Sequence, residues 1–86
     1  MTVPITMYAT AVCPFCIQAE RLLRAKGVAE IAKIRVDLDL TMRKTMMEKT
    51  GRRTVPQIYI ADLHVGGYED LVALDHRGEL DRLLED

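Results

Sequence analysis

The chain has 86 residues, of which 49% are hydrophobic and 29% charged, and its formal net charge is -1. These values are typical of an ordinary globular protein, and we expect residues 1–86 to form a single domain. A net charge so close to zero gives no electrostatic basis for binding nucleic acid or an anionic membrane. The sequence has no apolar run that could span a bilayer and no leader pattern at its start, so a cytoplasmic location is expected.

The first half of the chain predicts strands alternating with helices. Residues 3–8 form a short β-branched run that predicts a buried strand, and a helix with an apolar stripe follows it. Residues 31–38 alternate in polarity and predict a second strand. The apolar face of that strand would be formed by Ala32, Ile34, Val36 and Leu38. Residues 40–51 predict a helix capped by Asp39 or Thr41, and we expect its methionines to fill the core.

The second half predicts a hairpin and two further helices. Residues 57–60 and 63–65 predict two short strands that are joined by a tight turn and pair antiparallel. Residues 68–78 and 79–86 predict the helices, so the order of elements is βαβαββαα. Strands linked through a helix are parallel when they are sheet neighbours, and the hairpin adds an antiparallel half. The predicted fold class is therefore α/β, with a four-stranded mixed sheet flanked by helices.

Both cysteines stand in one Cys-Pro-Phe-Cys turn at the start of the first predicted helix. Because proline favours the first helical position, Pro14 makes Cys13 the expected N-cap, with its sulfur over unpaired backbone N–H groups. Such a position lowers the pKa of a thiol below its usual value of about 8.5. Cys16 lies one turn further in, where we expect a less exposed sulfur and a higher thiol pKa. This pattern indicates an attacking Cys13 and a resolving Cys16.

Two structural roles for the cysteines are weaker alternatives. A disulfide that closes so short a loop stabilises a fold by only about 1.9 kcal/mol, which is weak support for a domain that already has a core. A structural zinc ion needs four ligands, and the two histidines, His64 and His76, lie far along the chain without finger-like spacing. We therefore expect neither a bound metal nor a purely structural disulfide.

Four motifs in order make the chain resemble the glutaredoxin family, and within it the short bacterial dithiol type. They are "CPFC" after the first strand, "TVPQIYI" at the third, "GGYEDL" at the start of a helix and "LDHRGELDRLL" at the end. The resemblance implies a thioredoxin-like fold and a thiol-disulfide oxidoreductase with glutathione as co-substrate and no bound cofactor. The implied partners are glutathione and disulfide-bonded or glutathionylated proteins. Nothing indicates an obligate dimer, so we expect a monomer.

The resemblance also implies how glutathione is held near its sulfur. The peptide bond between Val55 and Pro56 would be cis and would face Cys13, since cis bonds are essentially confined to X-Pro. The Val55 backbone, next to Thr54, would then pair with glutathione in the manner of an added strand. Without the two cysteines, the same three residues would be interpreted as the start of an edge strand, where proline is tolerated.

The γ-glutamyl end of glutathione would bind at the N-terminus of the helix that follows the two adjacent glycines. Gly67, like the glycine before it, lets the backbone approach a ligand closely. The N–H groups of Tyr68, Glu69 and Asp70 would meet the carboxylate, and the Asp70 side chain would meet the ammonium group. A simpler alternative is that Glu69 and Asp70 only complement the helix dipole. Asp70 is able to do both.

The resemblance assigns the glycine carboxylate of glutathione to Arg43, with Arg52 and Arg53 as nearby alternatives. Two residues depart from the family pattern. Many relatives have a lysine where this chain has Thr10, and most have tyrosine in place of Phe15. Because Thr10 carries no charge, we expect a Cys13 pKa that is less depressed, and weaker glutathione binding, than in a lysine-bearing relative.

Two rival functions share the same cysteines. One is a glutaredoxin-like electron donor that is reduced by thioredoxin reductase. The other is an iron-sulfur cluster carrier, in which two chains would share a cluster through Cys13 and glutathione. Pro14 weighs against the carrier, because cluster-binding relatives usually have a smaller or non-proline residue at that position.

Overall fold

A computed structural model describes residues 3–85 and contains the elements in the predicted order. Their bounds are β1 Ile5–Ala9, α1 Pro14–Ala25, β2 Ala32–Arg35, α2 Leu40–Thr50, β3 Gln57–Ile60, β4 Leu63–Gly66, α3 Tyr68–His76 and α4 Glu79–Leu84. The strands form one sheet in the order β2-β1-β3-β4. β1 pairs parallel with β2 and antiparallel with β3, which pairs antiparallel with β4, so the predicted mixed sheet is confirmed. The last residue of the predicted final helix, Asp86, lies outside the described residues.

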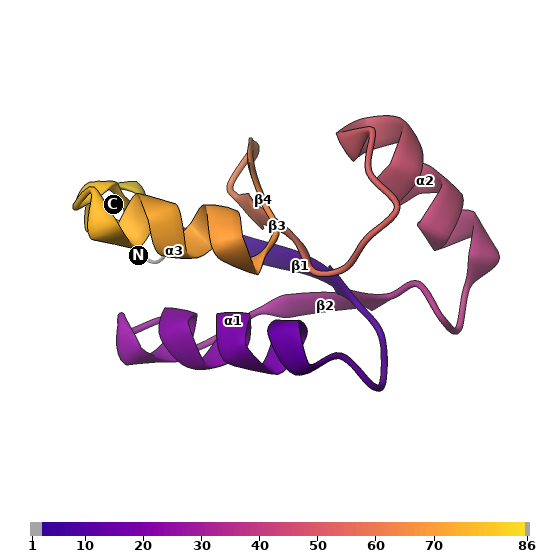
Figure 1. Ribbon diagram of the computed structural model, residues 1–86, viewed down its shortest axis with the longest axis horizontal. Helices are drawn as coiled ribbons and strands as arrows, with labels where there is room; N and C mark the ends of the chain where they lie inside the picture. The colour runs from indigo at the N-terminus through magenta and orange to yellow at the C-terminus, as the bar shows by residue number, and fades with distance from the viewer. Residues whose placement is uncertain (1–2, 86) are drawn as a thin grey trace.

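Alternation along β1 divides the core into two layers. Ile5 and Met7 point into the larger cluster, which α1, α3 and α4 complete, whereas Tyr8 points into a smaller cluster with Val36 and Met46. As a result α1 and α3 cover one face of the sheet and α2 the other. In Figure 1, α2 stands apart from α1 and α3. Each fully buried aliphatic side chain contributes about 1.5–3 kcal/mol relative to exposure.

The N-cap of α2 starts the helix, and its methionines pack it against the core. Of the two predicted caps, Asp39 is the one used: its carboxylate accepts the N–H groups of Thr41 and Met42 at 2.9 and 3.3 Å. Met46 is fully buried, and Met42 and Met47 are partly buried against the same cluster. The prediction that the methionines fill the core is confirmed.

The second strand differs from the prediction. β2 ends at Arg35, and the expected apolar face is wrong at both ends, because Ala32 is exposed and Leu38 is 74% exposed. Ile34 is half-buried and Val36 fully buried. β2 is an edge strand, and the chain leaves the sheet in a turn after Arg35. The alternation of side chains in a strand therefore does not predict their direction beyond Arg35.

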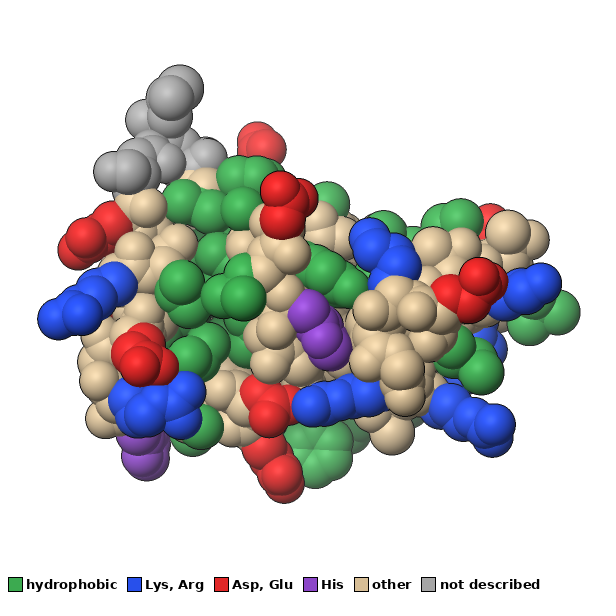
Figure 2. Space-filling view, turned by 90° about the horizontal axis from the view of Figure 1, so that it is seen from above, with side chains coloured by type: hydrophobic (Ala, Val, Ile, Leu, Met, Phe, Trp, Pro, Cys, Tyr) green, Lys and Arg blue, Asp and Glu red, His purple; other side chains and the backbone are tan. Residues whose placement is uncertain are grey.

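The surface is mixed in charge. On the face shown in Figure 2, acidic and basic side chains are interspersed rather than gathered by sign. Some of these charges join separate elements, as where the Lys26 ammonium lies 2.7 Å from the Asp75 carboxylate. Within residues 3–85, no helix combines the length and the apolar character that a membrane span requires.

Candidate active site

The Cys-Pro-Phe-Cys turn opens α1 as predicted. Cys13 is the N-cap with Pro14 at the first helical position, and the Cys13 Sγ accepts the N–H of Cys16 at 3.1 Å. The two cysteines form a disulfide. Once the disulfide is reduced, the unpaired N–H groups and the positive end of the helix dipole favour a thiolate on Cys13.

The two cysteines differ in position more than in burial. Their exposed fractions are 6% for Cys13 and 5% for Cys16, so accessibility does not separate them. Cys13 lies outside the helix, with its sulfur against the backbone donors, whereas Cys16 lies inside the first turn and belongs to the same buried cluster as Ala19. The expected asymmetry in thiol pKa therefore rests on the capping geometry.

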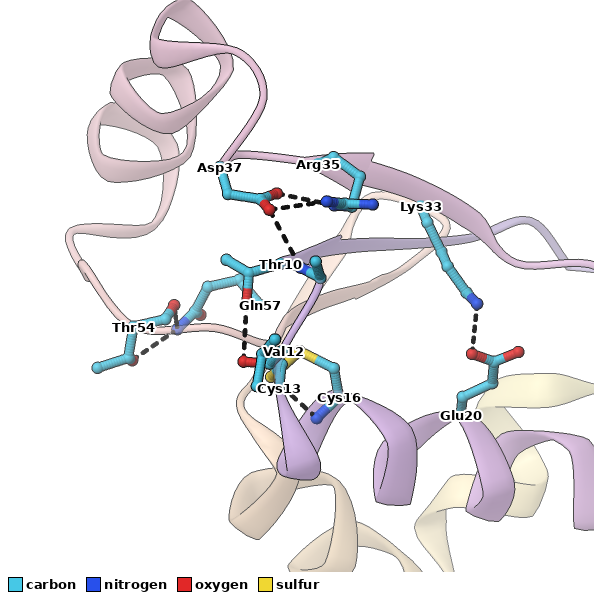
Figure 3. Close-up of a disulfide and its surroundings, with 11 residues drawn as sticks. Thr10, Val12, Cys13, Cys16, Glu20, Lys33, Arg35, Asp37, Thr54 and Gln57 are labelled. Carbon is cyan, nitrogen blue, oxygen red and sulfur yellow. Dashed lines mark hydrogen bonds and ion pairs between the residues drawn. A yellow bond between two sulfur atoms is a disulfide. The ribbon is translucent and has the colours of Figure 1, made fainter.

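The loop before Cys13 is tied to the chain just beyond β2. The Ala11 N–H donates to an Asp37 carboxylate oxygen at 3.2 Å, and Arg35 binds the same carboxylate through two hydrogen bonds of 2.7 Å (Figure 3). The Arg35 guanidinium, assisted by the Ala11 amide, holds the pKa of Asp37 well below its ordinary value of 3.8. Sequence analysis missed this contact because it joins positions 26 residues apart and no local pattern marks it.

A pocket of about 330 Å³ adjoins the redox turn. It brings together six residues predicted to bind glutathione, namely Thr54, Val55, Pro56, Gly67, Glu69 and Asp70. Neither cysteine is among its lining residues, but Phe15, which stands between them in the sequence, is. The pocket therefore lies beside the disulfide rather than over it.

The Val55-Pro56 peptide bond is cis, as the resemblance implied. Pro56 is buried and Val55 is half-buried. Val55 and Pro56 line the same pocket as Phe15 of the redox turn, so the cis turn and the redox turn are neighbours in space. Residues from two distant parts of the sequence thus form one site.

Asp70 has two partners inside the protein. Its carboxylate accepts the Gly67 N–H at 2.9 Å, which caps α3, and pairs with the Arg52 guanidinium at 2.8 Å. The Arg52 guanidinium, with the Gly67 amide, holds the pKa of Asp70 below its ordinary value. Gly66 has a φ of +114°, and a Cβ at this position would collide with the Asp70 carboxylate. The glycine before the cap is therefore required by both conformation and space.

Arg43 and Arg52, both candidates for binding the glycine carboxylate of glutathione, lie in different places. Arg52, an alternative in the sequence analysis, lines the pocket. Arg43 lies on α2 and is not among the lining residues, so its contact with glutathione stays a prediction. Sequence analysis also missed an aromatic pair at the pocket, in which the Phe15 and Tyr68 rings stack with centroids 6.2 Å apart. Phe15 is 55% exposed. The signal available in the sequence was an aromatic residue between the two cysteines.

A Cys-x-x-Cys pair at the N-terminus of the first helix, on a mixed sheet of this order, defines the class of thioredoxin-like thiol-disulfide oxidoreductases. The family model for glutaredoxin matches residues 5–65. The chain belongs to the glutaredoxin family.

Known relatives agree over nearly the whole chain. A glutaredoxin of Neisseria meningitidis serogroup A is 48% identical over 93% of this chain and 94% of its own. Glutaredoxin 3 of Escherichia coli is 43% identical over 94% and 96%. Among solved structures, the dithiolic glutaredoxin 2-C-Grx1 of Trypanosoma brucei brucei has a TM-score of 0.86 at 34% identity, covering 96% of this chain and 88% of that one. A buckwheat glutaredoxin-glutathione complex has a TM-score of 0.86 at 25% identity, covering 95% and 76%.

Proposed function

We propose that the chain is a glutathione-dependent thiol-disulfide oxidoreductase that reduces protein disulfides and glutathione mixed disulfides. The Cys13 thiolate attacks one sulfur of the substrate disulfide, which breaks that bond and releases one substrate thiolate. The Cys16 thiolate then attacks the Cys13 sulfur, which forms the intramolecular disulfide and releases the second thiol. Two molecules of glutathione restore the dithiol and leave as glutathione disulfide. Glutathione acts here as co-substrate, with no bound cofactor.

The proposal rests mainly on the position of the Cys13 sulfur, which caps α1 beside the pocket. Cys13 accepts a helix N–H, and the adjoining cavity combines the cis turn at Val55 with the N-terminus of α3. A tripeptide with a carboxylate and an ammonium at one end matches a helix N-terminus that carries an aspartate. The buckwheat relative solved as a glutathione complex supports the same substrate.

The individual contacts follow from this placement. Thr54, Val55 and Pro56 would hold the cysteinyl part of glutathione by backbone pairing. Gly67, Glu69 and Asp70 would hold its γ-glutamyl end, as the helix N-terminus they form lines the pocket.

Arg43 would bind the glycine carboxylate from α2. Replacing Arg43 with Met should raise the KM for glutathione, whereas replacing the exposed neighbouring Lys44 with Met should not.

The test is a glutathione-coupled disulfide reduction assay on the wild type, Cys13→Ser and Cys16→Ser. We expect the Cys13 variant to lose all activity, and the Cys16 variant to keep activity toward glutathione mixed disulfides, because glutathione itself can resolve Cys13. Running the wild type with thioredoxin reductase in place of glutathione and glutathione reductase checks the reductant. Faster turnover with thioredoxin reductase would contradict the proposal.

We also propose that the protein acts as a cytoplasmic monomer on disulfide-bonded or glutathionylated proteins. The composition, the lack of an apolar run in the sequence and the family's dithiol chemistry support this setting. Cell fractionation and sedimentation of the purified protein would test location and oligomeric state separately.

A further inference from the structure

A fully buried glutamine stands directly behind the cis turn. Gln57, the first residue of β3, has an exposed fraction of 0%. Its amide nitrogen lies 3.0 Å from the Thr54 carbonyl oxygen and 3.3 Å from the Thr54 hydroxyl (Figure 3). Its carboxamide oxygen lies 2.8 Å from the Nε2 of His64 on β4. Both ends of the buried carboxamide are therefore occupied.

The contact with the Thr54 carbonyl fixes the orientation of this carboxamide, because a carbonyl oxygen only accepts hydrogen bonds and so requires the amide nitrogen. The carboxamide oxygen then faces the Nε2 of His64, which donates to it in the tautomer that carries its hydrogen on Nε2. His64 is in turn held against the Tyr59 ring, with ring centroids 5.1 Å apart. Rotating the Gln57 carboxamide by half a turn would place two acceptors against each other at the Thr54 carbonyl, and two donors against each other at the His64 tautomer that carries its hydrogen on Nε2. The amide nitrogen is thus kept on Thr54.

Holding the Thr54 carbonyl also orients the next amide. The Thr54 carbonyl and the Val55 N–H belong to one planar peptide unit, in which the two groups point in opposite directions. With the carbonyl turned toward the buried Gln57, the Val55 N–H is turned away from it. Among the hydrogen bonds that residues 3–85 make, none uses this N–H, and Val55 lines the pocket.

We propose that Gln57 is a positioning residue for glutathione. By holding the Thr54 carbonyl, Gln57 keeps the Val55 N–H free and oriented toward the ligand, and the hydrogen bond from His64 holds the Gln57 carboxamide in place. This role deepens the proposed function and rests on it. Gln57 itself does not line the pocket, so it acts through Thr54 and Val55.

The test compares two versions of one cysteine-containing peptide, capped by glutathione or by 2-mercaptoethanol, with dithiothreitol as the reductant. The second cap has no main chain to pair with Val55. Gln57→Met keeps the volume but loses both kinds of hydrogen bond, so we expect the KM for the glutathione-capped peptide to rise about 3- to 10-fold. We expect kcat/KM for the other peptide to stay within about twofold of the wild type.

Two further variants separate positioning from packing. Gln57→Glu keeps an acceptor for His64 but sets a carboxylate against the Thr54 carbonyl, so its KM should rise at least as much as in Gln57→Met. His64→Phe removes the hydrogen bond to the Gln57 carboxamide with little change in volume, and should give a smaller rise in the KM for the glutathione-capped peptide. Gln18→Met, a matched change at an exposed position of α1, should leave both substrates unaffected.

The outcomes are distinct. An unchanged KM for the glutathione-capped peptide in Gln57→Met and Gln57→Glu would overturn the role of Gln57 while leaving the proposed function in place. Equal losses of kcat/KM with both peptides would mean that Gln57 has a merely structural role, and would also overturn the positioning role. A wild type that does not prefer the glutathione-capped peptide would refute the proposed function, and the positioning role with it. Should the Gln57 variants not fold, an unchanged KM in His64→Phe would decide against the inference.

Discussion

The Arg52 guanidinium lies 2.8 Å from the Asp70 carboxylate, and this ion pair joins the loop before β3 to the first turn of α3. The same carboxylate oxygen accepts the Gly67 N–H, so one group both caps the helix and closes the wall of the pocket. The two side chains are 47% and 43% exposed, which limits the stabilisation from the pair to about 1 kcal/mol or less. The ion pair matters mainly because it holds the Asp70 carboxylate at the wall of the pocket.

Replacing Arg52 with Gln should raise the pKa of Asp70 toward its ordinary value, because the guanidinium is the main cause of the depression. The stability that Asp70 contributes is present above its ordinary pKa of 3.8 and is lost as the pH falls through the lower folded-state value. In Arg52→Gln the contribution should therefore be smaller, and its loss should be complete at a higher pH. Titrating the Asp70 carboxyl carbon by NMR measures the shift, and Arg53→Gln is the matched control. An unshifted Asp70 titration in Arg52→Gln would show that the pair does not form in solution.

Replacing Gly66 with Ala should destabilise the protein by more than about 2 kcal/mol, because the new Cβ adds a collision with the Asp70 carboxylate to the strain of a left-handed backbone. Gly78→Ala is the matched control: its φ is +74°, and beyond its own neighbouring stretch of chain nothing lies within 4 Å of the added Cβ. It should cost only about 1 kcal/mol. Urea unfolding of the two variants gives the difference, and equal losses would contradict a tight contact at Asp70.

Replacing Asp37 with Asn should lower the melting temperature most at neutral pH. The pKa of Asp37 is depressed in the folded state, so its contribution is complete above the ordinary value of 3.8 and fades as the pH falls below it. The gap between wild type and Asp37→Asn should therefore narrow as the pH falls below about 4. Thermal melts between about pH 7 and about pH 3 measure the gap. A gap that stays constant would mean that Arg35 and Ala11 do not favour the ionised carboxylate.

How far the sequence predicts this molecule depends on the range of the interactions involved. The element order, the cap at Cys13 and the hairpin were predictable, because period, proline position and turn chemistry are local signals. The outward turn of Leu38 was not, since alternation predicts a side chain's direction only while the strand continues. The Asp37 tether joins positions 26 residues apart, and the His64–Gln57 contact joins β4 to β3. The Gln57–Thr54 contact is local, but no spacing rule marks any of the three.

Replacing Thr10 with Lys should lower the pKa of the Cys13 thiol and strengthen glutathione binding. Thr10 donates to the Val12 carbonyl in the loop that leads to Cys13, so an ammonium group on this loop would lie near both the thiolate and a bound carboxylate. Thr10→Met has a similar length without the charge and should leave both values unchanged. Thiolate absorbance against pH measures the first effect, and identical midpoints for the lysine and methionine variants would contradict it.

The most direct measurement is the thiol pKa of each cysteine alone, obtained by following thiolate absorbance in reduced Cys16→Ser and Cys13→Ser. If the backbone amides at the start of α1 stabilise the Cys13 thiolate, the first variant titrates well below about 8.5 and the second at or above it. A Cys13 pKa of about 8.5 or higher, or the same value for both cysteines, would contradict an activated attacking thiol at this helix.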